Sequence, residues 1–114
     1  MKIFVPFEIA KKLEEKGFKT KNTDWCYLDG DLVQVKKYVN ISPYEYAPTI
    51  SQVLNWLREK NIHLYTDIDN EGWFFEIKCL KTRFMINTDF FKRYSTYELA
   101  ALAGIEYVID NNLI

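Results

Sequence analysis

Histidine chemistry in this chain of 114 residues has to use His63, because no other histidine is present. Asp67 follows His63 on the same segment, and Glu76 lies on a segment that could pair with it as an antiparallel strand. An imidazole beside a carboxylate can act as a general base. A small enzyme using His63 with Asp67 or Glu76 is therefore one hypothesis. A solvent-facing histidine on a strand is the more frequent interpretation of this pattern.

Thiol and metal chemistry have weaker support in the sequence. A nucleophilic cysteine needs a lowered pKa and a nearby base, and strand alternation puts His63 on the face opposite Cys79. Cys26 and Cys79 offer no cluster with the ligand number of a structural zinc site. Residues 67–72 resemble the start of a calcium loop, but Lys78 stands where that loop needs a bidentate carboxylate. We therefore expect core thiols, a polar turn at 67–72, no metal and no cofactor.

Aromatic residues make up 17% of the chain, so that some of these rings must lie near the surface. Tyrosine and tryptophan are enriched at protein interfaces because each combines a rigid apolar area with a polar group. The hairpin pattern and the loop after it direct several of them outward, Tyr38 included. We predict a protein-interaction face formed by Trp25, Tyr27, Tyr44, Tyr46 and Trp56. The alternative is that the loop 40–48 covers these rings and completes the core.

The charge pattern argues against nucleic acid as a partner. The formal net charge is −1, and basic and acidic residues alternate along the chain without a long basic run. A role with nucleic acid would depend on scattered lysines, namely Lys11, Lys12, Lys16, Lys19, Lys36 and Lys37. The first residues are too charged for a signal peptide, and no apolar run approaches the roughly 20 residues that span a bilayer. We therefore expect a cytoplasmic protein without a membrane partner, whose cysteines stay reduced.

Three helices follow from apolar periodicity and capping residues. The first covers 7–16, with Gly17 as its terminator and Phe18 as the closing hydrophobic contact. The second starts after Thr49, which forms a capping box with Gln52, and ends near residue 60. The third runs from about Ser95 to Asp110, with a capping box between Ser95 and Glu98.

The third helix is apolar over more than half of its circumference, which is typical of a central helix or one shared with a partner. Ala100 and Gly104 leave a shallow strip on it where another backbone could approach closely. We therefore predict that a homodimer, if one forms, is joined through this C-terminal helix.

Two hairpins are predicted between the helices. Asp29-Gly30 is a two-residue turn signal between strands at 25–28 and 32–37, which pairs Cys26 with Val33 and Tyr27 with Leu32. The second hairpin joins 62–67 to 73–80 around residues 69–72, and residues 84–86 form a candidate fifth strand. The order is helix–hairpin–helix–hairpin–helix. We expect one α+β domain over 1–114, with an antiparallel sheet of four strands, or five with 84–86, and the helices on one face.

The chain also resembles a family of small uncharacterised proteins from phages, prophages and mobile elements of Bacteroides-type gut bacteria. The resemblance rests on the opening Val5 to Leu13 with Gly17-Phe18, on Tyr46 to Ile62 with its Trp56-Leu57-Arg58 segment, and on the aromatic strand Trp73 to Lys78. It covers most of the chain and carries no catalytic signature. It implies a phage-related accessory role and transfers no functional residues. Because no catalytic motif appears, we expect a non-enzymatic module that binds a protein partner.

Overall fold

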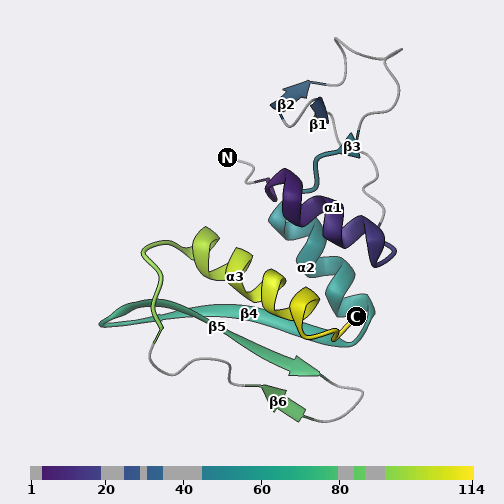
Figure 1. Cartoon of the computed structure of the whole chain (residues 1–114). Helices are drawn as coiled ribbons and strands as arrows, with labels where there is room; N and C mark the ends of the chain where they lie inside the picture. The colour runs from purple at the N-terminus through teal and green to yellow at the C-terminus, as the bar shows by residue number, and fades with distance from the viewer. Residues whose placement is uncertain (1–3, 19–24, 29–30, 35–44, 80–83, 87–91) are drawn as a thin grey trace. The chain divides into compact units, whose positions relative to one another are not determined.

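The structure is a computed structural model that describes residues 4–18, 25–28, 31–34, 45–79, 84–86 and 92–114 (Figure 1). The chain divides into two compact units, Met1–Gln52 and Val53–Ile114, and each is considered by itself. In chain order, the described elements are a helix, three strands, a helix, three strands and a helix. Whether both units form one folding domain, as we expect from the sequence, stays a prediction.

The first unit begins with helix α1, Phe7–Glu15, which buries Ile9, Ala10 and Leu13 as the periodicity predicted. Its end confirms the predicted glycine terminator. Gly17 has a φ of 97°, its N–H donates to the carbonyl of Glu14, and the N–H of Phe18 donates to the carbonyl of Leu13. These two hydrogen bonds make a Schellman motif, which the buried Phe18 closes.

Three strands complete the described part of this unit: β1 (Trp25–Leu28), β2 (Asp31–Gln34) and β3 (Glu45–Tyr46). β1 lies between β2 and β3, and both pairings are antiparallel. The predicted register of the hairpin is confirmed, since Cys26 is opposite Val33 and Tyr27 is opposite Leu32. Strand β3 falls in a segment that the sequence indicated to be a loop.

Helix α2, Ile50–Glu59, crosses the boundary between the units. The predicted capping box is present, because the N–H of Gln52 donates to Thr49 Oγ1 (3.1 Å) and the N–H of Thr49 donates to Gln52 Oε1 (2.9 Å). The chain turns directly into the next strand through Asn61, whose φ is 64°.

The second unit contains strands β4 (Ile62–Asp69), β5 (Gly72–Cys79) and β6 (Phe84–Ile86), in the order β4-β5-β6. The candidate strand at 84–86 is therefore real. The predicted architecture is wrong, however: the described strands form two three-stranded sheets, where we expected one sheet of four strands or five. Helix–hairpin order is also broken, because β3 and β6 each add a strand after a hairpin. Short-range turn signals specify each hairpin but not which strands share a sheet.

Helix α3, Tyr97–Asp110, packs on one face of this second sheet (Figure 1). Its N-cap is Thr96, whose hydroxyl accepts from the N–H of Leu99 (3.2 Å), so the predicted capping box of Ser95 and Glu98 is not formed. Ser95 and Thr96 are adjacent and both are common N-cap residues, and Thr96 has the extended backbone typical of that position. None of the helices in the described part of the chain is long and apolar enough to cross a membrane.

Candidate functional site

Strand β4 lies at the edge of the second sheet. All eight of its residues pair with β5, and among the described strands none pairs with its other side. The far side of β5 is different, since β6 pairs with one end of it and Tyr94 pairs with Trp73 at the other. An unpaired strand edge presents backbone N–H and C=O groups that can bind another strand.

The hydrogen bonds of Trp73 show which β4 groups face outward. Trp73 donates to the carbonyl of Tyr94 (2.9 Å) and accepts from its N–H (2.7 Å), so its backbone groups point away from β4. Ile68 is directly opposite Trp73, and its own backbone groups must therefore point away from β5. The alternation extends this direction to Thr66, Leu64 and Ile62. We call the outward N–H and C=O groups of these four residues the open edge of β4.

The outward backbone groups of the two central residues of the open edge have no hydrogen-bond partner among the described residues. The carboxylate of Asp67 accepts from the N–H of Ile68 (2.8 Å), which occupies the end of the edge nearest the turn. In the part of the chain that the structure describes, no hydrogen bond engages the outward groups of Leu64 or Thr66. As far as the described residues go, these four backbone groups remain available to pair with an incoming strand.

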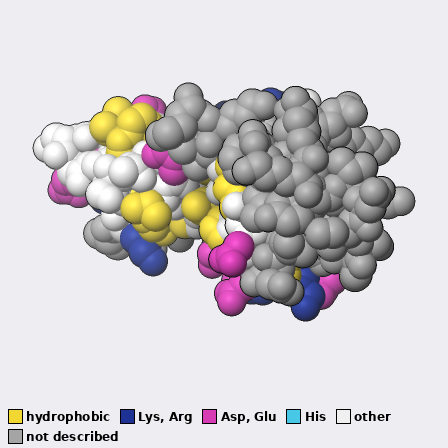
Figure 2. Space-filling model, turned by 90° about the horizontal axis from the view of Figure 1, so that it is seen from above, with side chains coloured by type: hydrophobic (Ala, Val, Ile, Leu, Met, Phe, Trp, Pro, Cys, Tyr) yellow, Lys and Arg dark blue, Asp and Glu magenta, His cyan; other side chains and the backbone are white. Residues whose placement is uncertain are grey.

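Apolar side chains are exposed along the same strand. Ile68 is 54% exposed and Tyr65 is 37% exposed, and they lie on opposite faces of β4. Hydrophobic side chains are visible between charged ones on the described surface in Figure 2. A strand that carries exposed apolar side chains beside an unpaired backbone edge has the features of a binding surface.

The face of the hairpin that carries Tyr65 is polar and internally bonded. The Tyr65 hydroxyl donates to Glu76, which raises the pKa of Tyr65, and the Lys78 ammonium lies 5.7 Å from the centroid of the Tyr65 ring. His63 is opposite Lys78 in the ladder, and within the described residues it bonds neither Asp67 nor Glu76. The structure therefore adds no hydrogen bond in support of the enzyme hypothesis, which stays a prediction.

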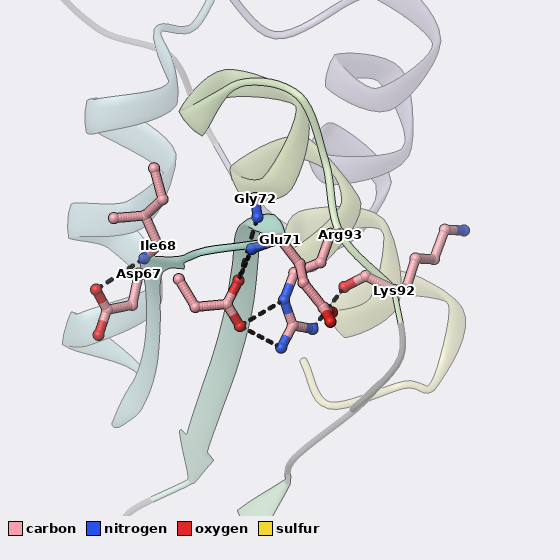
Figure 3. A network of polar contacts seen from close by, with 7 residues as sticks. Asp67, Ile68, Glu71, Gly72, Lys92 and Arg93 are labelled. Carbon is pink, nitrogen blue, oxygen red and sulfur yellow. Dashed lines mark hydrogen bonds and ion pairs between the residues drawn. The ribbon is translucent and has the colours of Figure 1, made fainter.

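The segment that resembled a calcium loop is the turn of the β4–β5 hairpin (Figure 3). Asp69 Oδ1 accepts from the N–H groups of Glu71 (2.9 Å) and Gly72 (3.1 Å), while Oδ2 accepts from Arg93 Nε (2.9 Å) and Nη2 (2.6 Å). These hydrogen bonds, those from Arg93 most of all, lower the pKa of Asp69 to about 2. The described residues contain no group of three or more metal-ligating side chains.

The aromatic residues predicted to form one interaction face have different environments. Tyr27 is only 7% exposed, its ring contacts Phe7 edge-on at 5.4 Å, and its hydroxyl donates to the carbonyl of Val5. This burial raises the pKa of Tyr27 and contradicts the outward position that we expected for it. Trp56 is half-buried, with the Lys60 ammonium 5.0 Å from its ring centroid.

The remaining members of that predicted face lie outside what the structure describes. Trp25 and Tyr46 belong to strands β1 and β3, but only their backbone is placed. Tyr38 and Tyr44 fall outside the described residues. An interaction surface at these positions therefore stays a prediction.

The strip of small residues on α3 is occupied within the second unit. Ala100 and Gly104 are buried, and a Cβ added at Gly104 would lie 2.4 Å from Leu64 Cδ1. Leu64 therefore occupies the strip at Gly104, and a homodimer through this helix stays a prediction. A dimer through α3 would have to use the outer side of the helix, where Leu99 is 48% exposed.

Cys79 is half-buried and lies beside a cavity of about 420 Å³. The cavity is lined by Glu59, Lys60, Asn61, Ile62, Cys79, Leu113 and Ile114. Cys26 lies in β1, but its burial is not described. The predicted burial of the two thiols can therefore be compared with the structure only at Cys79, which is half-buried.

The lysines of the nucleic-acid hypothesis are only partly described. Lys11 and Lys12 are exposed on α1 and Lys16 is half-buried at its end, whereas the other three fall outside the described residues. The described lysines therefore form no extended basic surface that would favour this hypothesis.

Comparison with known proteins identifies no relative, because no family model, curated protein or solved structure matches this chain. The resemblance to phage and mobile-element proteins therefore stays a prediction, and the functional argument depends on the geometry of the chain itself.

Sequence reasoning found the strand β4 but missed its open edge. Alternation shows which side chains share a face, whereas the position of a strand within a sheet depends on which other strands pair with it. One signal in the sequence indicated that the strand is longer than we expected. Ile68 continues the apolar alternation past Asp67, where we expected the strand to end.

Proposed function

We propose that this chain is a non-enzymatic binding module that takes up a strand of a protein partner along the open edge of β4. The observation that carries the proposal is that Leu64 and Thr66, at the centre of an eight-residue edge strand, have outward backbone groups that no described residue engages. Strand addition derives affinity from backbone hydrogen bonds and specificity from alternate side chains. Tyr65 and Ile68 supply the exposed apolar contacts on the two faces.

The proposal explains why the exposed strand is tolerated. Natural edge strands are usually protected by charge, by proline or by a covering element. β4 has acidic residues only towards its turn, Asp67 and Asp69, and both carboxylates are engaged by hydrogen bonds. Within the described part of the chain, the centre of the edge has no such protection, as expected of a site that binds a strand.

The test compares three tagged proteins in affinity isolation: wild type, Thr66→Pro and Thr66→Ser. Proline removes the outward N–H of residue 66 and is tolerated at an edge position, because that N–H makes no bond to β5. Serine keeps the N–H and is the matched control. We expect partners retained by wild type and Thr66→Ser to be lost from Thr66→Pro, and the purified partner to reproduce this difference.

Circular dichroism of Thr66→Pro is the folding control, because loss of binding by an unfolded protein would say nothing about the open edge. If a folded Thr66→Pro protein retained every purified partner with unchanged affinity, binding along the open edge would be excluded. Partners that bind all three proteins equally would point to another surface, such as the predicted aromatic positions.

A further inference from the structure

The proposed function leaves the partner open, and the sequence of β4 suggests one. We propose that the strand bound at the open edge is β4 of a second copy of this chain, in antiparallel register about a two-fold axis at Tyr65. The inference rests on the proposed function, since it uses the same edge. The sheet β4-β5-β6 of one copy and the same sheet of the second copy then form one six-stranded sheet across the dimer.

The backbone of β4 is complementary to itself in this register. Leu64 of one copy faces Thr66 of the other, and because their N–H and C=O groups already point outward, each pair exchanges two hydrogen bonds. The axis repeats the pair, so all unpartnered groups of Leu64 and Thr66 are satisfied in both copies. The Ile68 N–H, which Asp67 already occupies, is not needed for this core of the ladder.

The side chains are complementary in the same register. His63 of one copy faces Asp67 of the other, where an imidazole N–H can donate to the carboxylate, and this pair occurs twice. The two Tyr65 rings meet at the axis, and the exposed Ile68 lies beside Ile62 of the second copy. A register centred on Asp67 would instead bring two carboxylates together, which is unfavourable.

Sedimentation velocity over a concentration series tests the dimer. A single strand pair is a small interface, so we expect wild type to change from monomer to dimer as concentration rises. Thr66→Pro should remain monomeric and Thr66→Ser should dimerise as wild type does. A wild-type protein that stays monomeric over the whole series would overturn the inference.

A charge exchange tests the register without altering the backbone. His63→Glu puts a carboxylate opposite Asp67 of the other copy, at both ends of the strand pair. We expect this repulsion to weaken the dimer about tenfold. Adding Asp67→Lys to His63→Glu should restore the dissociation constant to within about threefold of wild type, since each Glu then faces a Lys. The two positions are too far apart on one strand to contact each other, so rescue has to occur between copies.

Disulfide trapping gives an independent measure of the axis. Tyr65→Cys puts two thiols opposite each other in a non-hydrogen-bonded pair, within the reach of a disulfide. We expect oxidation to cross-link Tyr65→Cys, whereas His63→Cys, which faces residue 67, should give no more cross-linking than wild type with its native Cys26 and Cys79.

The outcomes separate the inference from the proposed function. A monomer whose purified partner is lost in Thr66→Pro would overturn self-association and leave strand binding at β4 intact. A dimer unaffected by Thr66→Pro and by the charge exchange would place self-association elsewhere, for instance on the outer side of α3, and would overturn the inference. Failure of both the dimer and the partner binding to respond to Thr66→Pro would remove both proposals.

Discussion

Asp69 shows how one carboxylate can hold the β4–β5 turn in place. It accepts two backbone N–H groups of the turn and two N–H groups of Arg93, whose guanidinium also lies 4.7 Å from the ring centroid of Phe74. These bonds favour the ionised carboxylate, so the pKa of Asp69 falls from 3.8 to about 2. The turn that ends the open edge of β4 therefore depends on this charge.

The lowered pKa predicts a specific loss of stability in acid. Because the folded-state pKa is below the unfolded one, the stabilisation is complete above about pH 4 and disappears as the pH falls towards about 2. Asp69→Asn should lower the unfolding temperature at pH 7, and its difference from wild type should shrink over that acidic range. Thermal unfolding followed by circular dichroism between pH 2 and pH 7 measures both effects.

Asp110→Asn is the matched control, because it removes an exposed carboxylate outside the turn network. A difference between wild type and Asp69→Asn that stayed constant from pH 7 to pH 2 would show that the carboxylate does not stabilise the turn through its charge.

Tyr27 shows the limit of residue-level prediction. Alternation correctly placed it opposite Leu32 in the ladder, and we then assigned its face to solvent. In the structure, Phe7 and the carbonyl of Val5 lie against this tyrosine and bury it. A strand pattern with apolar residues on both faces does not say which face a distant segment will cover, so this assignment required the tertiary structure.

At the scale of elements, the contact between α3 and β4 depends on the missing side chain of Gly104. A Cβ at this position would lie 2.4 Å from Cδ1 and 3.0 Å from Cδ2 of Leu64, which is itself buried. Glycine inside a helix costs about 1 kcal/mol relative to alanine, so the close packing must outweigh that cost.

Gly104→Ala should therefore destabilise the protein by about 1 kcal/mol, since overpacking costs about 1–3 kcal/mol and exceeds the gain in helix propensity. Urea unfolding measures the change. Leu64→Val removes part of the obstructing side chain, and we expect the double variant to be more stable than the sum of the two single effects predicts.

Ala103→Gly, on the half-buried side of the same helix, is the comparison for propensity alone. If Gly104→Ala stabilised the protein, the space at Gly104 would be open and the strip could again admit a second chain.

At the scale of the whole molecule, α2 links the two compact units. Ile50 is buried at its start, in the first unit, while Val53 and Leu57 are buried beyond the boundary. A helix this short is marginal without packing along its length. We therefore expect both units to unfold together, as the single-domain prediction requires.

Leu13→Ala tests this coupling from the first unit. Leu13 is fully buried on α1, so its truncation should cost about 2–5 kcal/mol. Urea unfolding followed by the amide NMR signals of both units should give one shared, lowered midpoint. Signals from α3 and β5 that kept the wild-type midpoint would show that the units unfold independently.

The sequence by itself determined three local features of this protein. The Schellman motif at Gly17, the capping box of Thr49 and Gln52, and the register of the first hairpin depend on residues close together in the chain, and all were predicted correctly. Their energetics involve a few neighbouring backbone groups, which residue types and spacing specify.

Only the tertiary structure decided which strands share a sheet and which surfaces remain open. Among the described residues, the expected single sheet is two sheets, Leu64 fills the strip beside Gly104, and no strand pairs with the outer edge of β4. Each of these depends on contacts between residues distant in the chain, where many arrangements satisfy the same alternation of apolar and polar residues. The candidate site consists of backbone groups, which every residue carries, and it became visible only once the neighbours of the strand were known.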